Sequence, residues 1–310
     1  MSKPTYGQVH IDVALTRASI AYTPGEYIGL SVFPGVPVEK PTGKYFIYTK
    51  ADWLRDEAQV RAQGTRAQRG GFGITNATYT CIEWAFAQGV PDEIVDNADN
   101  PLRPLDDATR FTTEKIFQRQ EKDVAALVFG NSIWSGSATP ATLWSNDTSD
   151  PLTDIETAVN SVASTIFREP NTGVIGRGLW RYLKNHPDVV DRIKYSAGPN
   201  SPAIVTLNAI AALGGLEAGR LYVGGAGEDT GPEGGTSTLA YIWGLHMFVG
   251  YVAPRASLLT PSAGYIFEYK SREVSRFRED QERQYVVETR ANWDAVVTAS
   301  DAGYLIKSAA

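Results

Sequence analysis

Three histidines are the side chains of this chain best suited to metal binding or to proton transfer near neutral pH. They are His10, His186 and His246, and no two of them share the close spacing of a zinc-binding pair. His186 directly precedes Pro187 at a helix start and is interpreted as a capping or loop residue. His246 lies in an apolar run and is interpreted as a core residue. The histidines therefore predict no metal centre.

Asp52, Asp56 and Glu57 are the carboxylates whose spacing could serve a general acid and base. Such a pair needs burial to raise the pKa of one carboxyl group. These three lie in a polar stretch that predicts exposure, so a soluble hydrolase is only a distant alternative. That alternative predicts a monomer or small oligomer with a deep cleft at these residues.

Glycine-rich segments offer the other familiar route to chemistry, through phosphate binding. Residues 224–235, GGAGEDTGPEGG, lack the Gly-Lys-Ser/Thr ending of a phosphate loop and carry acids that would repel phosphate. Residues 173–178, GVIGRG, have the wrong glycine spacing for a dinucleotide fingerprint. No G-x-S-x-G elbow is present. We expect no cofactor and no enzymatic activity.

The composition is that of a globular protein without an obvious ligand class. The chain has 310 residues, 43% hydrophobic and 21% charged, which suffices for one large domain or two ordinary ones. A net charge of −6 argues against a general nucleic-acid binder. The single cysteine, Cys81, forms no intrachain disulfide and is interpreted as a small buried residue. Neither an apolar signal core at the N-terminus nor a membrane-length apolar run is visible.

Residues 50–73, KADWLRDEAQVRAQGTRAQRGGFG, form the most unusual segment. Between Leu54 and Phe72 the only large apolar residue is Val60. Such a segment buries too little apolar surface to offset its ordering entropy. Strand-like runs flank it at residues 44–50 and 72–86. This pattern predicts a long hairpin arm that becomes ordered on a neighbouring molecule, with a flexible surface loop as the alternative.

An acidic segment, residues 91–107, offers a complementary charge. We expect the arginines of the arm to dock on it in a second subunit, because the arginine fork suits carboxylates. The alternative is a solvated loop that carries helix caps. Exposed pairs of this kind contribute only about 0–1 kcal/mol each, so they would set register more than affinity. The residues expected to take part are Arg55, Arg61, Arg66 and Arg69 on the arm and Asp92, Glu93, Asp96 and Asp99 on the acidic segment.

Two long helices are predicted by apolar residues that recur every three or four positions. The first spans residues 105–129, with Asp106 and Asp107 in its first turn, where the helix dipole favours acids. The second follows Asp150, a good N-cap, and Pro151, and it runs to Ile166.

The region between residues 172 and 252 alternates short helices and strands, which predicts a compact mixed unit. Strands are expected at 172–176, 220–224 and 239–252, and helices at 179–185, 187–195 and 206–213. The prolines of the first 38 residues predict instead an extended N-terminal arm. Its apolar anchors would be Ile28, Leu30, Val32 and Phe33.

The last part of the chain has the two-residue period of strands, and two long strands meet near Glu279–Glu282. Charges of both signs at their tip could pair with copies of themselves around a symmetry axis, or the tip could simply be solvated. The residues concerned are Arg276, Arg278, Glu279, Asp280, Glu282 and Arg283.

Several of these segments together resemble the major capsid proteins of tailed bacteriophages. The resemblance runs from about Val32 to the C-terminus and depends on the order and spacing of the motifs. They are ADWLRDEAQVRAQGTRAQRGGFG (51–73), PDEIVDNADNPL (91–102), LKNHPDVVDRIKY (183–195), YVAPRASLLTPSAGY (251–265) and DAGYLI (301–306).

The resemblance implies the α+β Hong Kong 97-type capsid fold, which encapsulins also use. It implies an N-terminal arm, an extended E-loop, a P-domain with a long spine helix and antiparallel strands, and a mixed A-domain. The corresponding ranges would be 1–40, 41–89, 90–150 with 255–299, and 151–254 with 300–310.

The function implied is self-assembly, as hexamers and pentamers, into the icosahedral head that encloses double-stranded DNA. Portal protein and, where they are needed, scaffolding or decoration proteins would be partners, with no membrane involved. The protein would be located in the virion after assembly in the host cytoplasm. The alternative with the same fold is an encapsulin-like compartment with a protein cargo.

Overall fold

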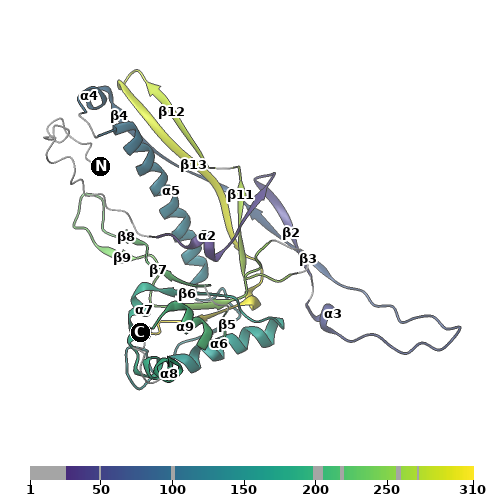
Figure 1. Cartoon of the computed structure of the whole chain (residues 1–310). Helices are drawn as coiled ribbons and strands as arrows, with labels where there is room; N and C mark the ends of the chain where they lie inside the picture. Colours follow the sequence, from purple (N-terminus) through teal and green to yellow (C-terminus); the bar gives the residue numbers. More distant parts are fainter. Residues whose placement is uncertain are drawn as a thin grey trace.

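A computed structural model describes residues 26–48, 50–98, 102–197, 205–216, 220–255, 260–270 and 272–310. The molecule is elongated, with an upper body made of a twisted sheet and one long helix, and a lower body of mixed helices and strands (Figure 1). A hairpin arm projects from the side of the upper body. Within the described ranges, no helix is both long enough and apolar enough to cross a membrane.

The upper body is organised around one long strand, β13 (Gln284–Val297). One side of β13 pairs antiparallel with β4 (Ile82–Pro91). The other side pairs first with β12 (Glu273–Glu279) and then with β11 (Gly264–Tyr269). Strand β1 (Gly35–Val38) adds to β11 in parallel. The predicted hairpin is confirmed at its tip, where β12 and β13 meet, but its first long strand is divided in two: β11 ends at Tyr269 and β12 begins at Glu273.

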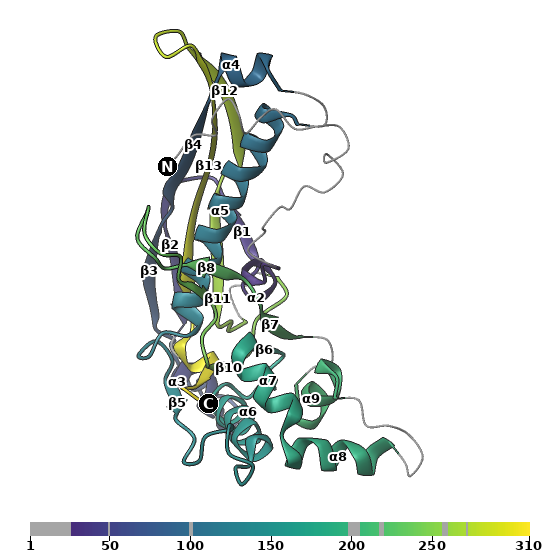
Figure 2. The same cartoon turned by 90° about the vertical axis from the view of Figure 1, so that its left-hand side faces the viewer.

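Helix α5 (Pro104–Val128) lies along one face of this sheet, as Figures 1 and 2 show, and confirms the helix predicted at 105–129. At 25 residues it is roughly 38 Å long. Its apolar stripe is buried against β13, where alternate residues point toward the helix. Polar contacts at the same interface include a hydrogen bond between the hydroxyls of Thr112 and Thr289, 2.8 Å apart.

The N-terminal residues that the structure describes do not form an extended arm throughout. Residues Gly29–Val32 form a short helix, α2, so the extended conformation expected there is wrong. Ile28, Val32 and Phe33 are buried in the core of the upper body, whereas Leu30 is 44% exposed. Within this turn Gly29 approaches α5 too closely for a side chain: a Cβ would lie 2.7 Å from a carboxylate oxygen of Glu121.

The lower body is a five-stranded sheet with helices around it. The strand order is β5 (Gly136–Ala138), β14 (Gly303–Ile306), β10 (Met247–Gly250), β6 (Thr172–Gly176) and β7 (Leu221–Gly224). The helices are α6 (Pro151–Ile166), α7 (Arg177–Asn185), α8 (Pro187–Ala197) and α9 (Leu207–Leu213), with a short 3-10 turn at Ser300–Ala302. The predicted alternation is confirmed, and Asp150 caps α6 by accepting the N–H of Thr153.

One predicted strand of the lower body is wrong. Residues 239–252 form two strands, β9 (Leu239–Tyr241) and β10, because the chain breaks between them. Strand β9 pairs instead with β8 (Gly227–Asp229) in a separate hairpin. The break has a packing cause: a Cβ at Gly176 would lie only 1.7 Å from the carbonyl oxygen of Gly244, so the backbones meet there.

The arm is made of β2 (Thr42–Tyr48) and β3 (Ile74–Thr80), which pair antiparallel along their full length. A short helix, α3 (Lys50–Leu54), follows β2, and the chain from residue 55 to 73 has no further helix or strand. Beyond Cys81 the chain enters β4 and the sheet of the upper body. The projecting segment is thus 42–80, and the rest of the range expected as an extended loop belongs to the body.

Candidate assembly surfaces

The base of the arm is held by an aromatic cluster at the point where its strands end. Tyr48, Trp53 and Phe72 lie with ring centroids 5.9–6.0 Å apart. The cluster shields little apolar surface, since Trp53 remains 54% exposed. Lys50 anchors the base to the lower body through an ion pair with Asp301 at 3.5 Å. The arm is therefore fixed at its base and exposed beyond it.

The arm tip confirms the polar, exposed character that its composition predicts. It turns at residues 62–65, where Thr65 N–H donates to the Ala62 carbonyl and Gly64 adopts a φ of 82°. Arg55 pairs with Glu57 at 3.4 Å. No described residue forms an ion pair with the other arginines expected to act there, Arg61, Arg66 and Arg69.

A second charged surface lies at the top of the upper body, where helix α4 (Asp92–Asp96) meets the β12–β13 turn. Arg278 donates to both carboxylate oxygens of Asp92, at 3.1 and 2.8 Å, and its Nε donates to Asp280 at 2.8 Å. These hydrogen bonds raise the pKa of Arg278 above its ordinary value. The structure therefore engages Arg278 and Asp92 with each other inside one subunit.

The remaining residues expected at these contacts have different surroundings. Glu279 and Glu282 both accept hydrogen bonds from the side-chain amide of Gln284. The Arg276 guanidinium lies 5.5 Å from the ring centroid of Tyr285, and Arg283 has a left-handed φ of 48°. The side chains of Glu93 and Asp96 are exposed on α4, and Asp99 lies outside the described residues.

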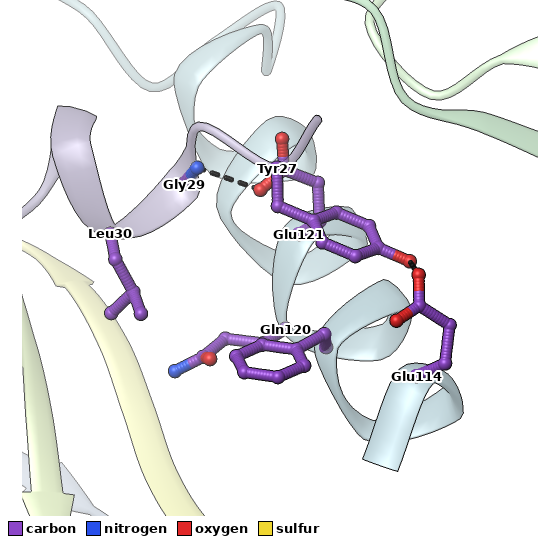
Figure 3. A pocket seen from close by; sticks show the side chains of 7 residues that line it. Tyr27, Gly29, Leu30, Glu114, Gln120 and Glu121 are labelled. Carbon is purple, nitrogen blue, oxygen red and sulfur yellow. Dashed lines mark hydrogen bonds between the residues drawn. The ribbon is translucent and has the colours of Figure 1, made fainter. Parts of the chain in front are cut away.

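Glu121, in the middle of α5, is a functional candidate that sequence reasoning missed. Its side chain is 3% exposed, and its carboxylate accepts three N–H groups. The backbone N–H groups of Ile28 and Gly29 donate to it at 3.0 and 2.7 Å, and the indole of Trp243 donates at 2.6 Å. Figure 3 shows the bond from Gly29. Desolvation raises the pKa of Glu121, and the three N–H donors partly offset that effect.

The three donors to Glu121 come from two different parts of the molecule. Ile28 and Gly29 start α2, whereas Trp243 lies in the link between β9 and β10 of the lower body. Glu121 therefore joins the N-terminal segment, the long helix and the lower body at one point, the Glu121 junction. Its spacing of four from Phe117 and three from Val124 follows the helical stripe, and this was the signal that could have revealed it.

A cavity of about 430 Å³ lies beside this junction (Figure 3). The Tyr27 hydroxyl points to Glu114 and donates to it at 2.9 Å, and the Tyr27 ring stacks on Phe117. Burial, reinforced by the Glu114 carboxylate, raises the pKa of Tyr27. On the same Phe117 ring, the Arg272 guanidinium lies 3.7 Å from the centroid. The polar groups that line the cavity thus serve to hold the N-terminal segment on α5.

The residues considered for chemistry are dispersed in the structure. Asp56 and Glu57 are exposed on the arm, and Asp52 accepts the N–H of Gly73 at the arm base. His186 is buried between α7 and α8, where its Nδ1 accepts the Asp188 N–H, which confirms its capping role. His246 lies in the β9–β10 link and not in a strand, and His10 is outside the described residues. Among the residues that the structure covers, no cluster of three potential metal ligands occurs.

Comparison with known proteins identifies the family. The chain is 32% identical over 240 residues to the major capsid protein of Pseudomonas phage JBD67, an alignment that covers 76% of this chain and 75% of the relative. It is 28% identical over 309 residues to the major capsid protein of Burkholderia phage BcepMu, an alignment that covers 96% of this chain and 95% of the relative. No family model matches.

Solved structures show the same fold. A phage-related protein from Bordetella bronchiseptica RB50 superposes with a TM-score of 0.69 at 24% identity, over 91% of this chain and 92% of that one. A chain of the capsid structure of cyanophage P-SCSP1u superposes with a TM-score of 0.62 at 12% identity, over 93% of this chain and 90% of that one. At these identities the likeness concerns the fold alone.

The chain belongs to the family of phage major capsid proteins. It has the Hong Kong 97-type α+β capsid fold, as the sequence motifs imply. It is a structural protein that assembles into an oligomeric shell and is located in the capsid of the virion.

Proposed function

We propose that this chain forms the icosahedral head of a tailed phage, as hexamers and pentamers that close around double-stranded DNA. Its family membership supports a shell. The observation that carries the proposal is the arm, which is anchored at its base and has three arginines without an ion pair among the described residues. A folded body with such an exposed, polar extension is built to complete its contacts on a neighbour.

In the proposed assembly, each part of the subunit serves a different contact. The projecting part of the E-loop range 41–89, residues 42–80, lies over the neighbouring subunit, and the A-domain, 151–254 with 300–310, faces the five- and six-fold axes. The tip of the P-domain, 90–150 with 255–299, meets its copies near the three-fold axes, and the N-terminal arm, 1–40, ties capsomers together. Each contact can be weak, because a closed shell engages all of them at once.

The proposed cargo is DNA held without sequence readout. A net charge of −6 supports this, because a strongly basic wall would oppose both packaging and release. Tight, salt-insensitive binding of isolated subunits to DNA would contradict it. Portal protein, and scaffolding or decoration proteins where they are needed, would join the shell during assembly in the host cytoplasm. An encapsulin-like compartment is the alternative, and it would contain a protein cargo in place of DNA.

Sedimentation velocity and negative-stain microscopy on the purified full chain test the proposal. We expect closed particles of megadalton mass, and nucleic acid inside particles recovered from infected cells separates a virion from a cargo compartment. A chain in which a short glycine turn replaces residues 55–72 is the matched variant. It should remain folded and lose closed particles. A soluble monomer whose arm resists protease would contradict the proposal, because its arm would be ordered without a neighbour.

A further inference from the structure

Strand β4 is an edge strand along its whole length. Its ten residues pair with β13 in continuous register, from Ile82 opposite Trp293 to Pro91 opposite Gln284. No described strand pairs with its other side, which we call the free edge of β4. The strand has no lysine and no bulge, and its proline stands at the last position. A long, regular edge of this kind presents unpaired N–H and C=O groups to another chain.

The limb that leads to the arm tip, residues Glu57–Ala62, likewise presents backbone groups that lack partners. From Glu57 to Ala62 the chain forms no helix or strand. Within residues 57–61 the one main-chain hydrogen bond among the described residues is the donation of Ala58 N–H to Asp56. Because the turn at 62–65 is local, this limb can be extended at the loss of no main-chain hydrogen bond among the described residues other than that of Ala58.

The side chains of the two segments are complementary in size. Val60 is fully exposed, although a β-branched side chain is favoured on a pleated sheet surface. In an extended limb it shares one face with Ala58 and Ala62. On β4, Ala85 and Ala87 are exposed and share a face, so they leave room for a larger neighbour on an added strand.

Charge and placement indicate that the partner is a second copy of this chain. Arg61 has no ion pair with a described residue, and exposed acids lie near both ends of β4: Glu83 at one end, and Glu93 and Asp96 beyond the other. Figure 1 shows β4 running from the side of the upper body where the arm projects to α4 on the opposite side, with the arm tip far from the strand. The limb and the free edge of β4 are different surfaces of the subunit, so a contact between two copies is head-to-tail and forms a ring where the rotation between subunits closes.

We propose that residues Glu57–Ala62 of one subunit pair, as an added β-strand, with the free edge of β4 in the neighbouring subunit of the same ring. Main-chain hydrogen bonds then provide the affinity, and Val60 beside Ala85 and Ala87 sets the position. The inference rests on the proposed function, because it requires neighbouring subunits in a shell.

Disulfide trapping tests the contact in assembled particles. The parent is Cys81→Ala, which removes the one native cysteine. Val60→Cys is combined in turn with Ala85→Cys and Ala87→Cys, since a disulfide needs Cα atoms less than about 7 Å apart. We expect oxidation to link at least one pair into a ladder that ends at rings of five and six subunits. Val60→Cys with Glu273→Cys, on the far edge of the upper sheet, is the control and should stay monomeric on a denaturing gel.

A proline substitution tests whether the contact uses the backbone. Val60→Pro removes one N–H and fixes φ, whereas Val60→Ala shortens only the side chain. We expect either change to leave the unassembled subunit folded, because this limb is exposed and has no hydrogen bond to the body among the described residues. We expect Val60→Pro to slow shell formation at least about tenfold more than Val60→Ala, the size of one lost hydrogen-bonded contact of about 1.4 kcal/mol.

The outcomes separate the two levels of the inference. The pairing is overturned if closed shells form without a Val60–Ala85 or Val60–Ala87 crosslink and the proline and alanine variants have equal effects. The proposed function then remains intact. Failure of the wild-type chain to form any shell under conditions that support its relatives overturns the proposed function, and the pairing with it. A crosslink in the Glu273 control of equal yield also overturns the pairing, because the trapping would then be nonspecific.

Discussion

The Glu121 junction and the arm use charged and aromatic residues in opposite ways. At the junction, a carboxylate that is 3% exposed accepts three N–H groups, one of them from the fully buried Trp243. On the arm, three arginines have no ion pair among the described residues, and Trp53 is 54% exposed. One region satisfies its polar groups inside the subunit, and the other leaves them for a contact outside it.

This difference separates the stability of the subunit from the stability of the shell. Unpaired buried polar groups are costly, so the junction must be satisfied before assembly for the body to fold. Exposed polar groups on the arm are hydrated and cost little while they are unpaired. We therefore expect substitutions at the junction to change the free energy of unfolding, and substitutions on the arm to change assembly.

The largest contrast is expected between two tryptophans. Trp243→Ala should lower the free energy of unfolding by about 3–5 kcal/mol, because it empties a buried site and removes a hydrogen bond to Glu121. Trp53→Ala should change it by less than about 0.5 kcal/mol, as for exposed positions in general. Urea unfolding of the unassembled subunit measures both. Equal effects of the two substitutions would show that the arm contributes to the stability of the body. The distinction between subunit stability and shell stability would then fail.

Replacement of Glu121 by glutamine should cost about 1–3 kcal/mol of the free energy of unfolding. A glutamine amide group cannot accept all three N–H groups, since its own NH₂ would face one of the donors. Glu114→Gln is the control, because among the described residues the Glu114 side chain accepts from Tyr27 alone, at a partly exposed site. Its cost should stay below about 1 kcal/mol. A neutral Glu121→Gln variant would show that the junction does not hold the N-terminal segment.

The pH dependence of stability sharpens the same point. The pKa of Glu121 is raised in the folded state, so between the ordinary value of 4.5 and the raised value the folded chain binds more protons than the unfolded chain. The contribution of Glu121 to stability therefore falls as the pH rises through that window. Asp294, whose pKa burial also raises, contributes with the same sign. The variant Glu121→Gln lacks this titrating carboxyl group. The difference in unfolding free energy between wild type and the variant, measured across this window, should therefore isolate the pH-dependent contribution of Glu121. An unchanged difference would contradict its burial as the cause.

The smallest effect on the subunit is expected from the arm arginines. Arg61→Ala, Arg66→Ala and Arg69→Ala together should change the free energy of unfolding by no more than about 0.5 kcal/mol. Shell formation, followed by light scattering, should nevertheless slow, and most at low salt, where exposed charges act over longer distances. The triple lysine variant keeps the charge and should recover most of the rate. Normal assembly of the alanine variant would exclude these arginines as contact residues.

The elements that sequence periodicity predicts well are those whose burial is one-sided. Helix α5, helix α6 and strand β13 each have one apolar face, so a period of three to four residues or of two residues identifies them. The turn of α2 and the break between β9 and β10 were missed. Both depend on close approaches, of Gly29 to Glu121 and of Gly176 to Gly244, between residues far apart in the chain.

The sequence by itself determined that residues 50–73 lack the apolar side chains for a core of their own, and its ordered motifs identified the capsid family. The arm is exposed in the structure because no burial could order it. Only the tertiary structure decided that Glu121 joins three parts of the molecule, that Arg278 is engaged within its own subunit, and that one edge of β4 is left unpaired. These features depend on the pairing of distant segments, and local periodicity contains no information about such pairing.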